Sequence, residues 1–227
     1  MSEVRRFLGD AGLVAARDLR IEFRSRVVVG QVVPFALLVL VLFGFALDAD
    51  HRTLRTFASG LFWVAVLLSA LLAVHRSAAL ELSDGTLDAL RMSGLPPAAL
   101  FLGKATAVFV QLMLLEVVLL GGLLVLYGVQ VVDPMLLLVS GLLAGVAVAA
   151  AGTLYGALAS GLGARETLLP ILLLPVLAPV LIGATRAFDD ALGSVAVDGW
   201  AWTGLLAVAA LIATVVGALV HGVLIED

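Results

Sequence analysis

The sequence predicts an all-α integral membrane protein with six transmembrane helices. Of its 227 residues, 63% are hydrophobic and only 13% are charged, and the mean hydropathy is +1.19. A soluble domain is about half apolar and about a quarter charged. Most of this protein's surface must therefore face lipid. The apolar residues also fall into long runs separated by short polar segments, which is the pattern of a polytopic helical protein.

Six runs reach or approach the roughly 20 residues that a helix needs to cross a hydrocarbon core about 30 Å thick. The first run follows a charged leader and exceeds the roughly 7–15 apolar residues of a cleavable signal, so we expect a retained helix. The chain is thus expected to divide into a leader, residues 1–26, and a single transmembrane domain, residues 27–227. The predicted spans are residues 27–47, 57–74, 105–127, 135–160, 168–187 and 200–221.

The distribution of basic residues predicts the orientation. With the N-terminus placed in the cytoplasm, the outer side holds only Arg52, Arg55 and Arg186 of the 13 lysines and arginines. The rest lie in the leader and in the loops after the second and fourth helices. Because cytoplasmic segments carry the excess of Lys and Arg, we expect a multi-pass protein with both termini in the cytoplasm.

The leader has the pattern of an amphipathic helix. Apolar residues such as Phe7, Ala11 and Val14 recur at helical spacing, while Arg6 and Arg17 fall on other faces. A helix of this kind lies in the plane of the lipid headgroups. Two interpretations remain open: an anchor on the positive side of the membrane, or a surface helix that also contacts a cytoplasmic partner.

A polar interruption at residues 75–104 separates the second and third predicted spans on the cytoplasmic side. Within it, Asp84 can cap a short helix by accepting from the free N–H groups of the first turn. Gly94 and the prolines at 96 and 97 then end that helix. A two-turn helix is not stable alone, so it must dock onto the bundle or a partner. The residues of this expected coupling helix are Asp84, Gly85, Thr86, Leu87, Asp88, Leu90 and Met92.

Glu116 lies near the middle of the third predicted span. An ionisable group at that depth costs at least about 2.5 kcal/mol, so it should face the bundle interior or a cavity and mark a possible intramembrane pathway. The alternative is a neutral glutamic acid that donates one interhelical hydrogen bond. Gln111 falls on a different face of the same helix.

The fourth and fifth predicted spans carry features of close packing. The fourth is rich in small residues, which allow close approach of helices within one chain or across a dimer. The fifth contains Pro170, Pro175 and Pro179, which break its backbone hydrogen bonding. The small residues of the fourth span are Ser140, Gly141, Ala144, Gly145, Gly152 and Gly156.

Several kinds of chemistry are not expected. The absence of cysteine excludes disulfides, thiolate zinc sites and cysteine nucleophiles. His51, His75 and His221 stand at predicted membrane boundaries without a second histidine four residues on, so they are expected to be interfacial polar residues and not metal ligands. We expect no catalytic residue and no nucleic-acid partner. We also expect no ATP site, because Gly103-Lys104 lacks the glycine that begins a phosphate loop.

Several motifs resemble the haem exporter protein B family of cytochrome c maturation. The resemblance extends from the second to the fifth span, with two small departures, Asp88 in place of a glutamate and Gly94. The motifs that carry it are Trp63-Val-Ala-Val-Leu-Leu-Ser69, Glu81-Leu-Ser-Asp-Gly-Thr-Leu-Asp-Ala-Leu90, Leu95-Pro96, Lys104, Gly152-Thr-Leu-Tyr-Gly156, Leu168-Leu-Pro-Ile-Leu-Leu-Leu-Pro175 and Pro179-Val-Leu-Ile-Gly183.

The resemblance implies an ABC-2-type exporter permease in the cell inner membrane, working as a dimer with haem as cargo and no cofactor of its own. It implies a separate ATPase chain that binds ATP, and a haem-handling membrane partner. In that family fold, the leader helix and the loop after the second span contact the ATPase. Two alternatives remain: an exporter of another cargo (lipid, drug or glycan), and a membrane scaffold that transports nothing.

Overall fold

The computed structural model of the chain describes residues 2–26, 28–47, 51–83, 95–161 and 165–226, and every regular element in these ranges is helical. The elements are α1 (Ser2–Ser25), η1 (Val28–Val32), α2 (Val33–Ala46), α3 (His51–Ser83), α5 (Pro97–Tyr127), α6 (Pro134–Gly161), α7 (Arg165–Ala191) and α8 (Gly199–Glu226).

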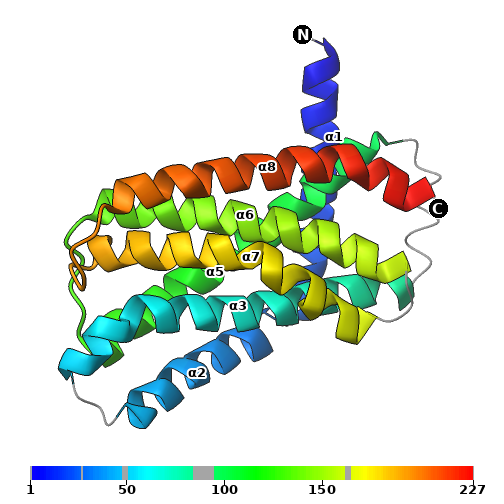
Figure 1. Cartoon of the computed structure of the whole chain (residues 1–227). Helices are drawn as coiled ribbons and strands as arrows, with labels where there is room; N and C mark the ends of the chain where they lie inside the picture. Colours follow the sequence, from blue (N-terminus) through cyan, green and yellow to red (C-terminus); the bar gives the residue numbers. More distant parts are fainter. Residues whose placement is uncertain (1, 27, 48–50, 84–94, 162–164, 227) are drawn as a thin grey trace.

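Five helices run side by side as a bundle, and α2 lies along one edge of it beside α3 (Figure 1). Helix α1 runs across the bundle near the end that carries the C-terminus, and it packs mainly on α5. In the described part of the chain, five spans are long and apolar enough to cross a membrane. These spans are Arg52–Leu72, Pro97–Tyr127, Pro134–Leu158, Ile171–Ala191 and Gly199–Gly222.

The first predicted span, residues 27–47, appears as a shorter apolar helix. The described apolar segment is Gly30–Ala46, which combines part of the π-helical turn η1 with α2. Pro34 stands in the first turn of α2, where its missing N–H leaves no helical hydrogen bond unmade. The chain thus changes from π-helical to α-helical geometry where a proline is tolerated.

The two helices that flank the polar interruption at residues 75–104 both extend into it. Helix α3 continues to Ser83 and α5 begins at Pro97, which occupies the first helical turn. Proline is favoured there because its fixed φ suits a helix start. The helices continue past the predicted spans because hydropathy marks where a helix leaves lipid, whereas the helix itself continues wherever Ala, Leu and Glu favour it.

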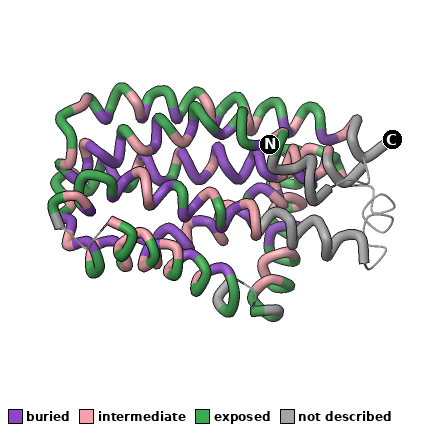
Figure 2. Tube along the Cα trace, turned by 60° about the horizontal axis from the view of Figure 1, so that its bottom comes forward, coloured by how far each residue is buried: buried purple, intermediate pink, exposed green. Residues whose placement is uncertain are grey.

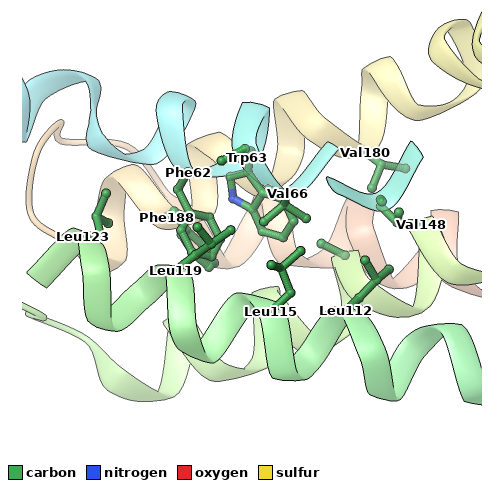
Figure 3. Packing of buried hydrophobic residues seen from close by; sticks show 14 of the residues in the cluster. Phe62, Trp63, Val66, Leu112, Leu115, Leu119, Leu123, Val148, Val180 and Phe188 are labelled. Atoms are coloured by element: carbon green, nitrogen blue, oxygen red, sulfur yellow. The ribbon is translucent and has the colours of Figure 1, made fainter. Parts of the chain in front are cut away.

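The core draws buried residues from α2, α3, α5, α6, α7 and α8, and Figure 3 shows its part around Trp63. Phe62, Trp63 and Phe188 pack at ring centroid separations of 5.1–5.4 Å, which is in the range of favourable aromatic pairs. One side of α5 contributes a row of buried leucines, Leu112, Leu115, Leu119 and Leu123. Buried positions line the facing sides of the helices, and exposed ones face outward (Figure 2).

Helix α6 begins at a capped N-terminus and packs closely against its neighbours. The Asp133 carboxylate accepts hydrogen bonds from the backbone N–H groups of Met135 and Leu136, both at 3.0 Å, as an N-cap residue does. Ser140 and Ala144 are fully buried. The small residues of α6 therefore support packing within the chain, against α5, α7 and α8.

Helix α7 is continuous from Arg165 to Ala191 in spite of its three prolines. It bends part-way along its length in Figure 1, and prolines are a common cause of bends in long helices. The predicted disruption of its backbone is thus expressed as a bend within one helix.

Candidate functional site

The first candidate site is the carboxyl group of Glu116, on the face of α5 that meets α6. The residue is 7% exposed. Its Oε2 lies 3.2 Å from the position that a Cβ would occupy at Gly141, and its Oε1 lies 3.4 Å from the equivalent position at Gly145. The aromatic ring of Phe188 on α7 lies near the same position at Gly141. Two glycines one turn apart thus form a shallow recess on α6, which the carboxyl group shares with the methyl group of Met113.

The recess does not supply all the hydrogen bonds that the carboxyl group of Glu116 can make. Within the described part of the chain, its Oε1 is buried and has no hydrogen-bond partner. An ionisable side chain inside a membrane costs at least about 2.5 kcal/mol and is a functional candidate by default. The structure therefore places Glu116 inside the bundle, as expected, and sequence reasoning missed only that Gly141 and Gly145 receive it.

The second candidate site is the contact between α1 and α5. At Gly103 of α5, an added Cβ would stand 2.6 Å from Cβ of Val14 and 2.7 Å from the carbonyl oxygen of Ala11. Val14 and Ala15 are buried in this contact. The backbones approach so closely that only glycine fits. Helix α1 is therefore held against the bundle by tight packing.

The arginines of α1 face away from that contact. Its arginines stand at exposed positions, whereas the residues that pack on α5 are small or apolar. Exposed arginines beside a membrane suit anionic lipid headgroups or an acidic protein surface. The exposed arginines of α1 are Arg5, Arg6, Arg17, Arg20 and Arg24.

The expected coupling helix, from Asp84 to Met92, lies outside the described residues. Its seven named residues therefore remain a prediction. The structure describes the two helices that flank it, α3 up to Ser83 and α5 from Pro97.

His221 is the histidine whose side chain the structure describes. It is 1% exposed, and its ring lies 5.5 Å from the ring of Phe101 on α5. Within the described ranges, neither ring nitrogen has a hydrogen-bond partner. The residue lies near the end of a membrane span, as expected, but it is buried between α5 and α8 instead of exposed at the interface. Among the described residues, no group of three or more His, Cys, Asp or Glu could hold a metal ion.

Two further contacts escaped the sequence analysis. The Tyr127 hydroxyl donates to the backbone carbonyl of Leu40 at 2.8 Å and so ties α5 to α2. Arg186, counted only as an outer charge, lies on α7 at 3.6 Å from the carboxylate of Asp189. The spacing of the second pair, three residues apart on a helix, was a readable signal. Tyr127 gave a weaker sequence signal, since a buried tyrosine hydroxyl usually has a hydrogen-bond partner but the sequence does not identify it.

The outward faces of the bundle decide the class of protein. Large apolar side chains such as Val125, Leu211 and Leu219 are 83%, 65% and 74% exposed. A water-soluble protein rarely exposes so much apolar surface, so these faces contact lipid. The protein is a multi-pass α-helical membrane protein.

Sequence comparison then gives the family. The family model described as CcmB protein matches residues 11–224, and the chain belongs to this family. A relative named Heme exporter protein B from Rhodobacter capsulatus is 35% identical over 167 residues, covering 74% of this chain and 77% of the relative. The protein of the same name from Escherichia coli K12 is 34% identical over 183 residues, 81% and 83% of the two chains. A third, from Pseudomonas aeruginosa, is 31% identical over 180 residues, 79% and 81% of the two chains.

Proposed function

We propose that this chain is the permease subunit of an ABC-type transporter for haem export or haem delivery in cytochrome c maturation. The observation that carries the proposal is membership of the CcmB family over residues 11–224, with relatives named Heme exporter protein B. The chain is a non-catalytic membrane subunit. ATP is bound and hydrolysed by a separate ATPase chain, and haem is the cargo.

We infer that the chain crosses the inner membrane six times with both termini in the cytoplasm. The five long spans supply five crossings, and η1 with α2, spanning Val28–Ala46, supplies the first. A helical stretch of that length rises about 28 Å at about 1.5 Å per residue, close to the thickness of the hydrocarbon core. The arginines of α1, at the end of the bundle that carries the C-terminus, favour the cytoplasm for that end. The leader, residues 1–26, and the transmembrane domain, residues 27–227, are then the two parts of the chain.

The segment from Asp84 to Met92, between α3 and α5, is proposed to receive the motion of the ATPase. Closure of two ATPase subunits on ATP would push this segment and rock the helix bundles of a permease homodimer against each other. Helix α1 packs tightly on α5 at Gly103, so α1 would move with the bundle and present its exposed arginines to the ATPase. This motion would be transmitted to a haem-handling membrane partner.

Glu116 is proposed to provide the polar group of an intramembrane pathway. Its burial against α6 and its unpartnered Oε1 support this role. Because neither glycine carries a side chain of its own, the carboxyl group can change partner when α5 and α6 shift. The rival role is structural, an interhelical contact with no part in transport.

The proposal is tested by tagging the chain in its own host, solubilising the membranes in mild detergent and identifying the proteins that co-purify. We expect an ABC ATPase together with a haem-handling membrane protein. An ATPase without any cytochrome-assembly partner would point to another cargo, such as a lipid, drug or glycan. An intact complex without an ATPase would leave the scaffold interpretation in place of the transporter.

A further inference from the structure

A groove between α3 and α7 opens on the outside of the bundle at the end where α3 begins. It encloses about 540 Å³, within the range of about 300–1,000 Å³ typical of small-molecule sites. Its walls are one face of α3, from Thr56 to Val64, and one face of α7, from Leu181 to Asp189, with Val195 beyond the end of α7. Phe57 and Ile182 are more than half exposed along its rim, so the groove is open to the side.

The groove is polar at one end and apolar at the other. The end nearest the helix termini carries Thr56, Thr185 and Arg186, whereas Trp63 and Leu181 line the end nearer the middle of the bundle. Trp63 is 1% exposed, and within the described ranges its indole N–H has no acceptor. A ligand that fits this gradient is amphipathic, with its polar group at Arg186.

Arg186 remains available to an anion in spite of its acidic neighbour. Its guanidinium lies 3.6 Å from Asp189, longer than the about 2.7–2.9 Å of a charge-assisted hydrogen bond. The Asp189 carboxylate also accepts from the Ser194 hydroxyl at 3.3 Å. The arginine side chain is 47% exposed, and a guanidinium has five donors suited to phosphate.

The length of the groove selects its occupant. Val64 is eight positions after Thr56, and Asp189 is eight positions after Leu181, which corresponds to a helical rise of about 12 Å. One leaflet of a hydrocarbon core about 30 Å thick is about 15 Å deep. A transmembrane helix of a partner would need a seam across both leaflets. The groove spans one leaflet, as an acyl chain does.

We propose that this groove binds one anionic glycerophospholipid, with its phosphate at Arg186 and one acyl chain between α3 and α7 against Trp63. A lipid there would fill the space between two helices of the bundle and would supply polar groups at its outer end.

The test uses the whole chain in vesicles, with Trp200→Phe and Trp202→Phe so that Trp63 is the remaining tryptophan. Trp63 fluorescence is measured with brominated phosphatidylglycerol or brominated phosphatidylcholine at equal mole fraction. We expect stronger quenching by phosphatidylglycerol. Arg186→Gln should lower the preference for the anionic lipid about fivefold, the contribution of one arginine near a lipid surface. Arg55→Gln, the same charge change outside the groove, should leave it unchanged.

A second pair of variants tests occupancy without changing charge. Gly60 lines the groove, and a Cβ added there has open space around it, so Gly60→Leu should fit and displace the acyl chain. Gly204 on α8 also has open space and lies outside the groove, so Gly204→Leu is the matched control. We expect loss of quenching by both lipids in Gly60→Leu only. Equal quenching in both variants would overturn the site, and so would a shift of cross-linked dimer to monomer in Gly60→Leu, because the groove would then be a contact between copies.

Discussion

The Glu116 carboxyl group lies across two glycines of α6, with Oε2 3.2 Å from the position of a Cβ at Gly141. The carboxyl group on α5 and the small residues on α6 look unrelated in the sequence, but in the structure they are in contact and form one site. A side chain at either glycine would compete with the carboxyl group for the same space. Glu116, Gly141 and Gly145 should be treated as a unit in mutagenesis.

Replacing Glu116 should change stability and function in opposite directions. Glu116→Leu removes an ionisable group that costs at least about 2.5 kcal/mol in the membrane, so we expect an equally or more thermostable protein. If the carboxyl group serves a pathway, the same variant should fail to support cytochrome c formation. Glu116→Gln keeps a polar group of the same shape and should retain most of the function.

The measurement combines thermal stability in detergent with haem staining of cytochromes in a host that lacks its own copy of the gene. Normal cytochrome levels in both Glu116 variants would remove the pathway role and leave an interhelical contact. A large loss of stability in Glu116→Leu would show that the carboxyl group has a partner in the membrane.

Gly103→Ala should release α1 from the bundle. The added Cβ would stand within 2.8 Å of Val14 and Ala11, so the contact must open. Overpacking of this kind costs about 1–3 kcal/mol. We expect faster trypsin cleavage at Arg17 and Arg20 of α1 in detergent-solubilised protein.

Gly12→Ala is the matched control for Gly103→Ala, because a Cβ at Gly12 on α1 meets nothing within 4 Å. Its cleavage rate should equal that of the unaltered protein. Equal rates in both variants would mean that α1 does not depend on the close approach at Gly103.

Tyr127→Phe should weaken the attachment of α2. The substitution removes the 2.8 Å hydrogen bond to the carbonyl of Leu40 and keeps the ring that packs near Gly44. A typical net contribution is about 0.5–1.5 kcal/mol, which lowers the midpoint of thermal unfolding by about 1–6 °C in a protein of this size. Tyr155→Phe on α6 changes the same group where the described structure gives it no hydrogen bond, so its midpoint should stay unchanged.

The positions of the long helices could be predicted from the sequence, whereas the contacts between helices could not. Residues 135–160 and 200–221 were placed within a few residues of the membrane spans in α6 and α8, because apolar runs of that length have few alternatives in lipid. Helices α3 and α5 are longer than the predicted spans 57–74 and 105–127, because helices extend beyond the hydrocarbon core. The depth of Glu116 was readable from its position, but its recess on α6 depends on how two distant segments pack.

The burial of His221 shows the same limit. Its place near the end of a span suggested an interfacial residue, yet α8 packs on α5 so that the ring lies beside Phe101. Gly217 of α8 makes room for the ring of Phe101. Periodicity gives the face of one helix, whereas the partner of that face is set by tertiary packing.

Leu87→Glu should uncouple the transporter if the segment from Asp84 to Met92 docks on the ATPase. A carboxylate in an apolar contact must be desolvated without a partner, which costs several kcal/mol and prevents docking. We expect normal insertion of the chain, loss of the ATPase from the purified complex and loss of cytochrome c formation. Leu87→Met keeps the apolar contact and should behave as the unaltered protein. Wild-type cytochrome levels in Leu87→Glu would exclude a coupling role for this position, and loss of the chain from the membrane would instead assign Leu87 to folding.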